Sequence, residues 1–156
     1  MRKSKINISG FKIGTAENRE GLTGVTVILA PDGGATAGVD VRGCAPGTRE
    51  TDLLDPRKTV QKIHAVVLSG GSAFGLEAAS GCVKYLAEQG VGFPIGDVCV
   101  PIVCSAVLFD LMIGDEKAYP DLLMGYEAAK SASSEFLSGC NGAGTGATVG
   151  KLLGFG

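Results

Sequence analysis

The residues best suited to chemistry in this 156-residue sequence surround one glycine turn, "HAVVLSGGSAFG", at positions 64–75. An apolar run enters the turn and a helical pattern leaves it, so Ser72 could be a nucleophile on a strained strand-to-helix elbow. That elbow requires Gly-x-Ser-x-Gly, whereas its last position here is Phe74. The only histidine, His64, begins the strand, so we expect it at the end of the strand away from Ser72. These departures favour a simpler prediction, in which Ser72 caps the helix and the glycines allow tight strand–helix packing.

Phosphate binding is also not supported by the glycine-rich segments. The turn lacks the Gly-x-Gly-x-x-Gly pattern of dinucleotide sites. The "GATVGK" segment lacks the P-loop pattern, since Thr145 replaces the first glycine and Leu152 replaces the final Ser or Thr. Lys151 remains an acid–base candidate, because burial among apolar residues lowers the pKa of a lysine. The alternative is that its stem lies along the surface and its ammonium is solvated.

The other polar groups give weaker signals. Asp40 and Arg42 are two residues apart on a strand-like run, so they could form an ion pair or frame a carboxylate-binding pocket, or they could be surface charges. The five cysteines are scattered without a Cys-x-x-Cys pair, which is typical of small buried side chains rather than a zinc site. We predict no metal and no cofactor.

Composition limits the possible partners. The chain is 45% hydrophobic and 19% charged, with a mean hydropathy of +0.27 and a net charge of −2. No basic stripe exists to neutralise phosphates, so we expect no nucleic-acid partner. The most apolar window, residues 98–114, is interrupted by Pro101 and Asp110 and is too short to span a bilayer. The basic start "MRKSK" is not followed by an apolar run and does not resemble a signal peptide. We predict a soluble, cytoplasmic protein without a membrane partner.

The patterns predict one domain over residues 1–156 with alternating strands and helices. The expected elements are a β-hairpin at Gly24–Gly43, a long loop with a short helical turn at Ala45–Gln61, a strand buried on both faces at Ile63–Gly70, a helix at Ser72–Gln89, one or two strands bent at Pro101 within 98–111, and a helix at Tyr119–Gly139. The apolar, glycine-dense end predicts that further structure follows.

Four motifs, taken in order, resemble one family. They are "GVDVRGCAPGTRETDLL", "HAVVLSGGSAFGLEAASG", "VPIVCSAVLFDL" and "GAGTGATVGKLLG". The set is similar to the aminopeptidase/amidase family typified by L-aminopeptidase D-amidase/D-esterase, which includes β-aminopeptidases and nylon-oligomer hydrolases. The resemblance covers about Gly21 to Gly154 and implies an α+β fold, an αββα sandwich that this N-terminal part leaves incomplete.

The resemblance also implies a mechanism. Members of this family cleave their own chain before a Ser or Thr, and the freed amine then serves as base for the hydroxyl nucleophile. Lys151 corresponds to a lysine of the active-site cluster in the nylon-hydrolase branch. Phe109 corresponds to a tyrosine implicated there, so a phenolic hydrogen bond to the oxyanion is in question. Gly70, Gly71 and Ser72 would border the substrate pocket or oxyanion region.

Two functions follow as alternatives. The first is the N-terminal portion of a self-processing hydrolase for small peptides or amino-acid amides. Its nucleophile would lie beyond this chain, on a C-terminal partner chain, so the chain alone would be inactive, and the protein would form a homo-oligomer. The second is a non-catalytic paralogue that binds small molecules or forms an oligomeric scaffold.

Overall fold

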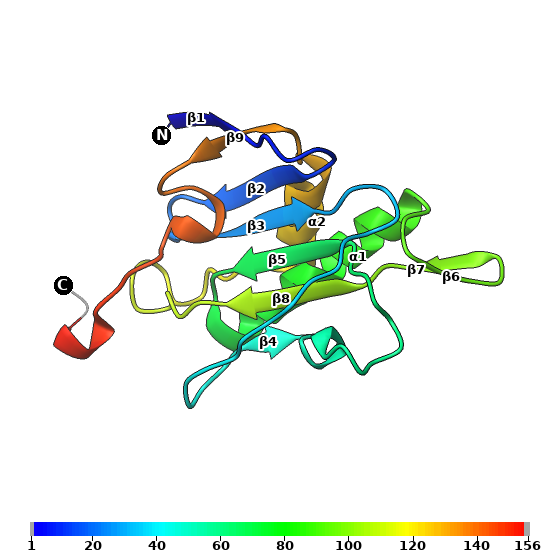
Figure 1. The fold of residues 1–156 in the computed structure, drawn as a ribbon. Helices are drawn as coiled ribbons and strands as arrows, with labels where there is room; N and C mark the ends of the chain where they lie inside the picture. The colour runs from blue at the N-terminus through cyan, green and yellow to red at the C-terminus, as the bar shows by residue number, and fades with distance from the viewer. Residues whose placement is uncertain (1, 155–156) are drawn as a thin grey trace.

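The computed structural model describes residues 2–154 (Figure 1). The strands are β1 (Arg2–Lys5), β2 (Lys12–Asn18), β3 (Thr23–Leu29), β4 (Thr48–Arg49), β5 (Ala65–Ser69), β6 (Phe93–Ile95), β7 (Val98–Val100), β8 (Val103–Val107) and β9 (Glu135–Ser138). The α-helices are α1 (Ala78–Glu88) and α2 (Leu122–Lys130), and the 3₁₀ helices are η1 (Asp52–Leu54), η2 (Ser72–Glu77), η3 (Gly142–Gly144) and η4 (Lys151–Leu153).

A five-stranded sheet in the order β2-β3-β5-β8-β4 forms the centre of the molecule (Figure 1). β3 lies antiparallel between β2 and β5, and β5 runs parallel to β8 with α1 in the connection between them. Because β5 and β8 are parallel, their carboxyl ends meet at one edge of the sheet. That edge therefore brings together the glycine turn after β5 and the residues that follow β8.

The two α-helices lie behind this sheet in Figure 1 and cover one face of it. Alternating strand residues such as Val25, Val27 and Val67 point toward the helices and are completely buried. The helices approach each other closely through glycines: a Cβ on Gly81 would lie 1.9 Å from the carbonyl oxygen of Leu122. Small residues on both helices therefore allow the short distance between them.

The opposite face of the sheet has no α-helix over it among the described residues. The short η3 packs there, at the β3 side, where the Ala143 N–H donates to the Thr26 hydroxyl at 3.1 Å. The connection between β3 and β4 runs in front of this face in Figure 1. Leu68, in the central strand β5, is 39% exposed there, and its neighbours Val66 and Ile28 are only partly buried. The prediction that this strand is buried on both faces is therefore wrong for the described residues, in which one layer of α-helices packs on one main sheet.

Two small antiparallel ribbons complete the fold. β1 pairs with β9 beyond the β2 edge of the main sheet, and β6 pairs with β7 in a hairpin that projects from the body (Figure 1). The split into β7 and β8 confirms the predicted bend at Pro101, and η1 confirms the predicted helical turn in the long loop.

Other sequence predictions need correction. The expected hairpin over Gly24–Gly43 does not form, because β2 and β5 occupy both edges of β3 and the chain after the Gly33–Gly34 turn makes a single bridge, at Ala35, to Ile63. The helix expected over Tyr119–Gly139 begins as predicted, with the Asp121 carboxylate accepting a hydrogen bond from the Met124 N–H at 2.8 Å. It ends at Lys130, since the following residues pair with β1 as β9.

Candidate functional site

The glycine turn after β5 is fixed by its own backbone hydrogen bonds. The N–H of Gly70 donates to the Gly24 carbonyl at 2.9 Å, and the N–H of Ser72 donates to the Leu108 carbonyl at 3.0 Å. The N–H of Gly71 donates to an Asp110 carboxylate oxygen at 2.6 Å. These three amides already have protein acceptors, so a ligand could use them only by replacing an existing bond.

Asp110 is the charged side chain at the centre of this arrangement. It follows β8 and is only 4% exposed. Its Oδ1 accepts from the Gly71 N–H, and its Oδ2 accepts from the hydroxyl of Thr23 at 2.8 Å. A buried carboxylate needs such donors because it loses its hydration shell. Thr23 is itself 2% exposed, so the pair joins the start of β3 to the ends of β5 and β8.

Glycine is required at position 70 because the Asp110 carboxylate occupies the space of a side chain, and not because of the backbone angles of Gly70. A Cβ added there would lie 2.1 Å from Asp110 Oδ2 and 2.3 Å from Thr23 Oγ1. Both distances are far below any normal contact, so any side chain at this position would displace the Thr23–Asp110 hydrogen bond. The glycine predicted to permit tight packing thus packs against a polar pair.

Ser72 does not cap the helix as predicted. The helix begins with a 3₁₀ turn whose N-cap is Gly71, and no side chain caps it. Ser72 instead has φ of +53°, a conformation uncommon for any residue other than glycine. The residue directly before Asp110, Phe109, is 42% exposed at the same edge of the sheet.

An aromatic pair borders the turn. The rings of Phe74 and Tyr119 stack with centroids 4.5 Å apart, and Phe74 is 57% exposed. A Cβ on Gly71 would lie 2.7 Å from the Cβ of Tyr119, so the turn and this pair are in direct contact. The edge of the sheet therefore offers an exposed apolar rim beside a buried carboxylate.

Lys151 stands apart from these residues. It lies in η4, which Figure 1 shows outside the body of the sheet, and its ammonium donates to the Thr148 carbonyl at 2.7 Å. The neighbouring Val149 and Leu152 are almost fully exposed. The described structure therefore does not bring Lys151 into a buried setting.

The remaining candidates lie elsewhere. Asp40 and Arg42 form an ion pair at 2.7 Å, but they lie in a loop rather than a strand and both side chains are largely exposed, as the surface-charge alternative predicts. His64 precedes β5 at the end away from the turn, where its Nδ1 accepts from the Ile102 N–H at 3.1 Å. Burial lowers the pKa of this imidazole. Neither position adds a group to the turn.

No group of three or more metal-ligating side chains occurs within residues 2–154. All five cysteines are unpaired, and burial raises the pKa of Cys82 to about 12. No described helix is long and apolar enough to cross a membrane.

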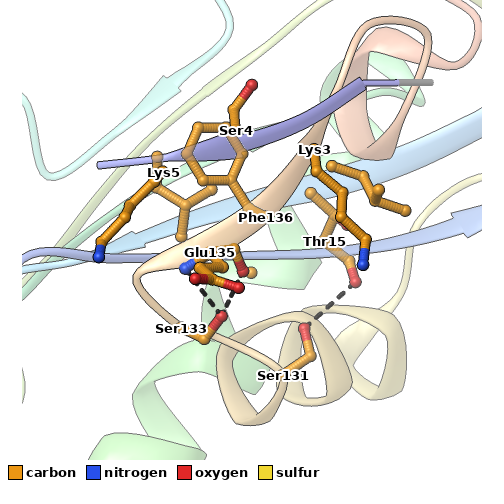
Figure 2. A pocket seen from close by; sticks show the side chains of 11 residues that line it. Lys3, Ser4, Lys5, Thr15, Ser131, Ser133, Glu135 and Phe136 are labelled. Carbon is orange, nitrogen blue, oxygen red and sulfur yellow. Dashed lines mark hydrogen bonds between the residues drawn. The ribbon is translucent and has the colours of Figure 1, made fainter. Parts of the chain in front are cut away.

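A cavity of about 680 Å³ lies between the β1–β9 ribbon, β2 and the end of α2 (Figure 2). Lys3, Lys5 and Phe136 line it. The Ser131 hydroxyl donates to the Ala128 carbonyl at 2.9 Å, and the Ser4 hydroxyl is hydrogen-bonded to the Ser138 hydroxyl at 2.8 Å. None of the residues around the glycine turn contributes to this cavity.

Comparison with known proteins decides the family. A model of peptidase family S58 matches residues 5–155. The chain belongs to peptidase family S58. The family resemblance seen in the four sequence motifs is therefore confirmed.

Individual relatives agree with this assignment. The chain is 47% identical over 131 residues to an uncharacterized aminopeptidase of Mycobacterium tuberculosis, covering 84% of this chain and 38% of the relative. It is 36% identical over 149 residues to a 6-aminohexanoate-oligomer endohydrolase of Paenarthrobacter ureafaciens, covering 95% of this chain and 39% of that protein. The chain thus spans less than half the length of these curated relatives.

Solved structures show the same fold. A protein from Pyrococcus horikoshii OT3 superimposes with a TM-score of 0.70 at 24% identity, over 90% of this chain and 44% of its own. A β-aminopeptidase of Burkholderia sp. gives a TM-score of 0.65 at 19% identity, over 89% and 41%. The S58 chain is therefore an α+β structure that contains part of the fold of these neighbours.

The site residues Asp110 and Thr23 were not predicted from the sequence. The available signal was an aspartate ending an apolar strand run, "AVLFDL", which is an unusual place for a charge. Its partners lie 39 and 87 residues away, so only the fold identifies them.

Proposed function

We propose that this chain forms the N-terminal, sheet-and-helix part of a self-processing aminopeptidase or amidase that hydrolyses amide bonds of small peptides or amino-acid amides. The observation that carries the proposal is the S58 match over residues 5–155, combined with coverage of only 38–39% of the curated relatives. The nucleophilic Ser or Thr would be supplied by polypeptide that corresponds to the uncovered part of those relatives.

The proposed reaction is acyl transfer to a chain-terminal hydroxyl. The hydroxyl oxygen attacks the amide carbon, its proton passes to the neighbouring α-amine, and the leaving amine takes up a proton as the C–N bond breaks. Water then hydrolyses the ester that remains, which releases the carboxylate and restores the hydroxyl. A mechanism with an amine base is compatible with this chain, whose only histidine lies away from the glycine turn.

The residues of this chain would shape the site rather than start the reaction. Gly70, Gly71 and Ser72 with the exposed Phe109 would border the substrate at the carboxyl edge of β5 and β8. Phe109 has no hydroxyl, so stabilisation of the oxyanion would fall to other groups. Lys151 would join the site only after its segment packs against further structure, because its neighbours Val149 and Leu152 are exposed.

The partner surface is the open face of the central sheet. Apolar side chains such as Leu68 and Val66 point outward from that face, and no α-helix within residues 2–154 covers them. We assign it to a second layer supplied by the nucleophile-bearing chain, and the assembled protein would be a homo-oligomer. Cytoplasmic conditions would keep the five unpaired cysteines reduced.

The proposal is tested by measuring amide hydrolysis with and without the partner chain. The purified 156-residue chain should release no p-nitroaniline from amino-acid p-nitroanilides, whereas co-expression with a nucleophile-bearing chain should give turnover. Replacing the nucleophile of the partner by alanine provides the matched control and should abolish turnover. Turnover by the 156-residue chain alone, or none from the assembled pair, would refute the proposal.

A second candidate is a non-catalytic scaffold, and the observation that favours it is the exposed apolar surface near the end of the described chain, where Val149 and Leu152 are almost fully exposed. Light scattering separates the two. A stable assembly of this chain alone supports the scaffold, and aggregation of the chain alone supports the incomplete enzyme.

A further inference from the structure

We infer that Asp110 is a positioning residue whose buried carboxylate, held by Thr23, fixes three separate segments of the candidate site relative to one another. The inference rests on the proposed function for its kinetic consequence. Its geometric basis lies entirely within this chain.

The first segment is the glycine turn. Asp110 accepts the Gly71 N–H at 2.6 Å, a short hydrogen bond typical of a carboxylate acceptor. Two backbone bonds run parallel to it, from Leu108 N–H to Ser69 and from Ser72 N–H to Leu108, at 2.9 and 3.0 Å. The turn is thus attached to the end of β8 at successive positions, and Ser72 is held at φ of +53°.

The second segment is the end of β8 itself. Phe109 directly precedes Asp110 in the chain, so the position of its ring depends on how the carboxylate is anchored. Oδ2 of Asp110 accepts from Thr23 Oγ1 at 2.8 Å, and both side chains are at least nine-tenths buried. Loss of Thr23 would leave Oδ2 of Asp110 without this donor, and loss of Asp110 would leave the buried Thr23 hydroxyl without its acceptor.

The third segment is the glycine-rich chain that leads toward Lys151. A Cβ on Gly146 would lie 1.9 Å from the Leu22 carbonyl oxygen and 3.2 Å from the Cβ of Asp110. Gly146 is buried, so this segment packs directly against the Asp110 side chain before the chain reaches the exposed Ala147. Asp110 is therefore the residue at which the turn, Phe109 and the path to Lys151 meet.

A purely electrostatic role can be separated from a positioning role by the choice of substitution. In D110N, the amide oxygen can still accept the Gly71 N–H, and the amide N–H can donate to Thr23 Oγ1. In D110A, both contacts are lost and a cavity remains. A positioning residue therefore predicts rescue by asparagine and loss with alanine, whereas a residue needed for its charge predicts loss with both.

The experiment measures kcat and KM of the assembled enzyme, this chain with its nucleophile-bearing chain, on an amino-acid p-nitroanilide. We expect kcat of D110A to fall at least 10-fold at matched folded fraction by circular dichroism, and kcat of D110N to stay within about 3-fold of wild type. The exposed Asp97 in the β6–β7 turn provides the control, and D97N should match wild type. A folded D110A with wild-type kcat, or a D110N as impaired as D110A, overturns the inference.

Two arms cover the remaining outcomes. If D110A does not fold, the same kinetic measurement is made on T23V, which deletes one contact to Asp110. T23V should lower kcat several-fold with KM little changed. An unchanged kcat in T23V overturns the inference. If the wild-type assembly shows no turnover, the proposed function has failed. Amide exchange of Gly71 then tests the anchor in this chain, with at least 100-fold faster exchange expected in T23V or D110A and unchanged exchange overturning it.

Discussion

Replacing Leu68 with aspartate tests whether the open face of the sheet is an interface. Leu68 lies in the middle of the sheet, between Thr26 of β3 and Ala106 of β8, and is 39% exposed. In the chain alone, L68D should lower the free energy of unfolding by about 1–3 kcal/mol, because the part of the leucine side chain that is already buried is lost and aspartate is unfavourable in strands.

The effect on association should be larger. Complete burial of a leucine side chain is worth about 1.5–3 kcal/mol, so covering the part that is still exposed contributes ~1 kcal/mol. An aspartate at this position has no cation among its cross-strand neighbours, Thr26 and Ala106, and burying an unpaired carboxylate costs several kcal/mol. Together these terms weaken binding of the second chain by about 3–5 kcal/mol, or roughly 10²- to 4 × 10³-fold in Kd.

The assay is calorimetric titration of this chain with the nucleophile-bearing chain, with unfolding in urea as the stability measurement. Leu123 on α2, 63% exposed, allows a matched control in which the same chemical change is made on the helical side. L123D should bind like wild type. Equal affinities for L68D and wild type, or equal weakening by both variants, would show that the open face is not the interface.

Other measurements test the remaining structural reasoning. Gly81→Ala should lower the free energy of unfolding, measured in urea, by about 1–3 kcal/mol. The added Cβ would meet a backbone carbonyl of the facing helix, and this overpacking exceeds the helix-propensity gain of ~1 kcal/mol. Gly38→Ala is the control and should have almost no effect, because a Cβ at Gly38 meets no atom within 4 Å. Burial lowers the pKa of His64 below its ordinary value of 6.5, so as pH falls the unfolded chain binds a proton before the folded chain does. The free energy of unfolding should therefore decrease as pH falls below about 6.5. Between about pH 7 and 5 this decrease should be smaller in H64N, and an equal decrease in H64N and wild type would contradict this account. Burial raises the pKa of the Cys82 thiol to about 12, whereas Cys44 is exposed. Ellman's reagent should therefore modify Cys44 rapidly and Cys82 only upon unfolding. Rapid modification of both thiols in the folded chain would contradict the packing of α1.

Local sequence signals predicted several elements well. The 3.6-residue spacing of apolar positions located α1, and Gly90, with φ of +67°, follows its end as expected. Pro101 separates β7 from β8, and Asp121 begins α2 as an N-cap. Each of these signals acts within one or two helical turns or strand residues, so it can be read without knowing the fold.

The errors have a common cause in long-range pairing. The run after Gly34 has the alternation of a strand, yet Val39 and Val41 are exposed in a loop because β3 already has two partners. The residues after Lys130 fit a helical pattern, yet they form β9 because β1, more than 100 residues earlier, offers an edge. Strand pairing of this kind depends on which edges are free, and a local pattern contains no information about that.

By itself, the sequence determined the family, the α+β class, the strand–turn–helix at Gly70–Ser72 and the exclusion of a serine elbow and a phosphate loop. Tertiary structure alone decided that this turn is anchored by Asp110 and Thr23 and that its three amides are already used. It also placed Lys151 outside the turn and left one face of the sheet open. The physical reason is that residue types specify short-range chemistry, whereas the partners of a buried charge are chosen by strands that meet only in the folded chain.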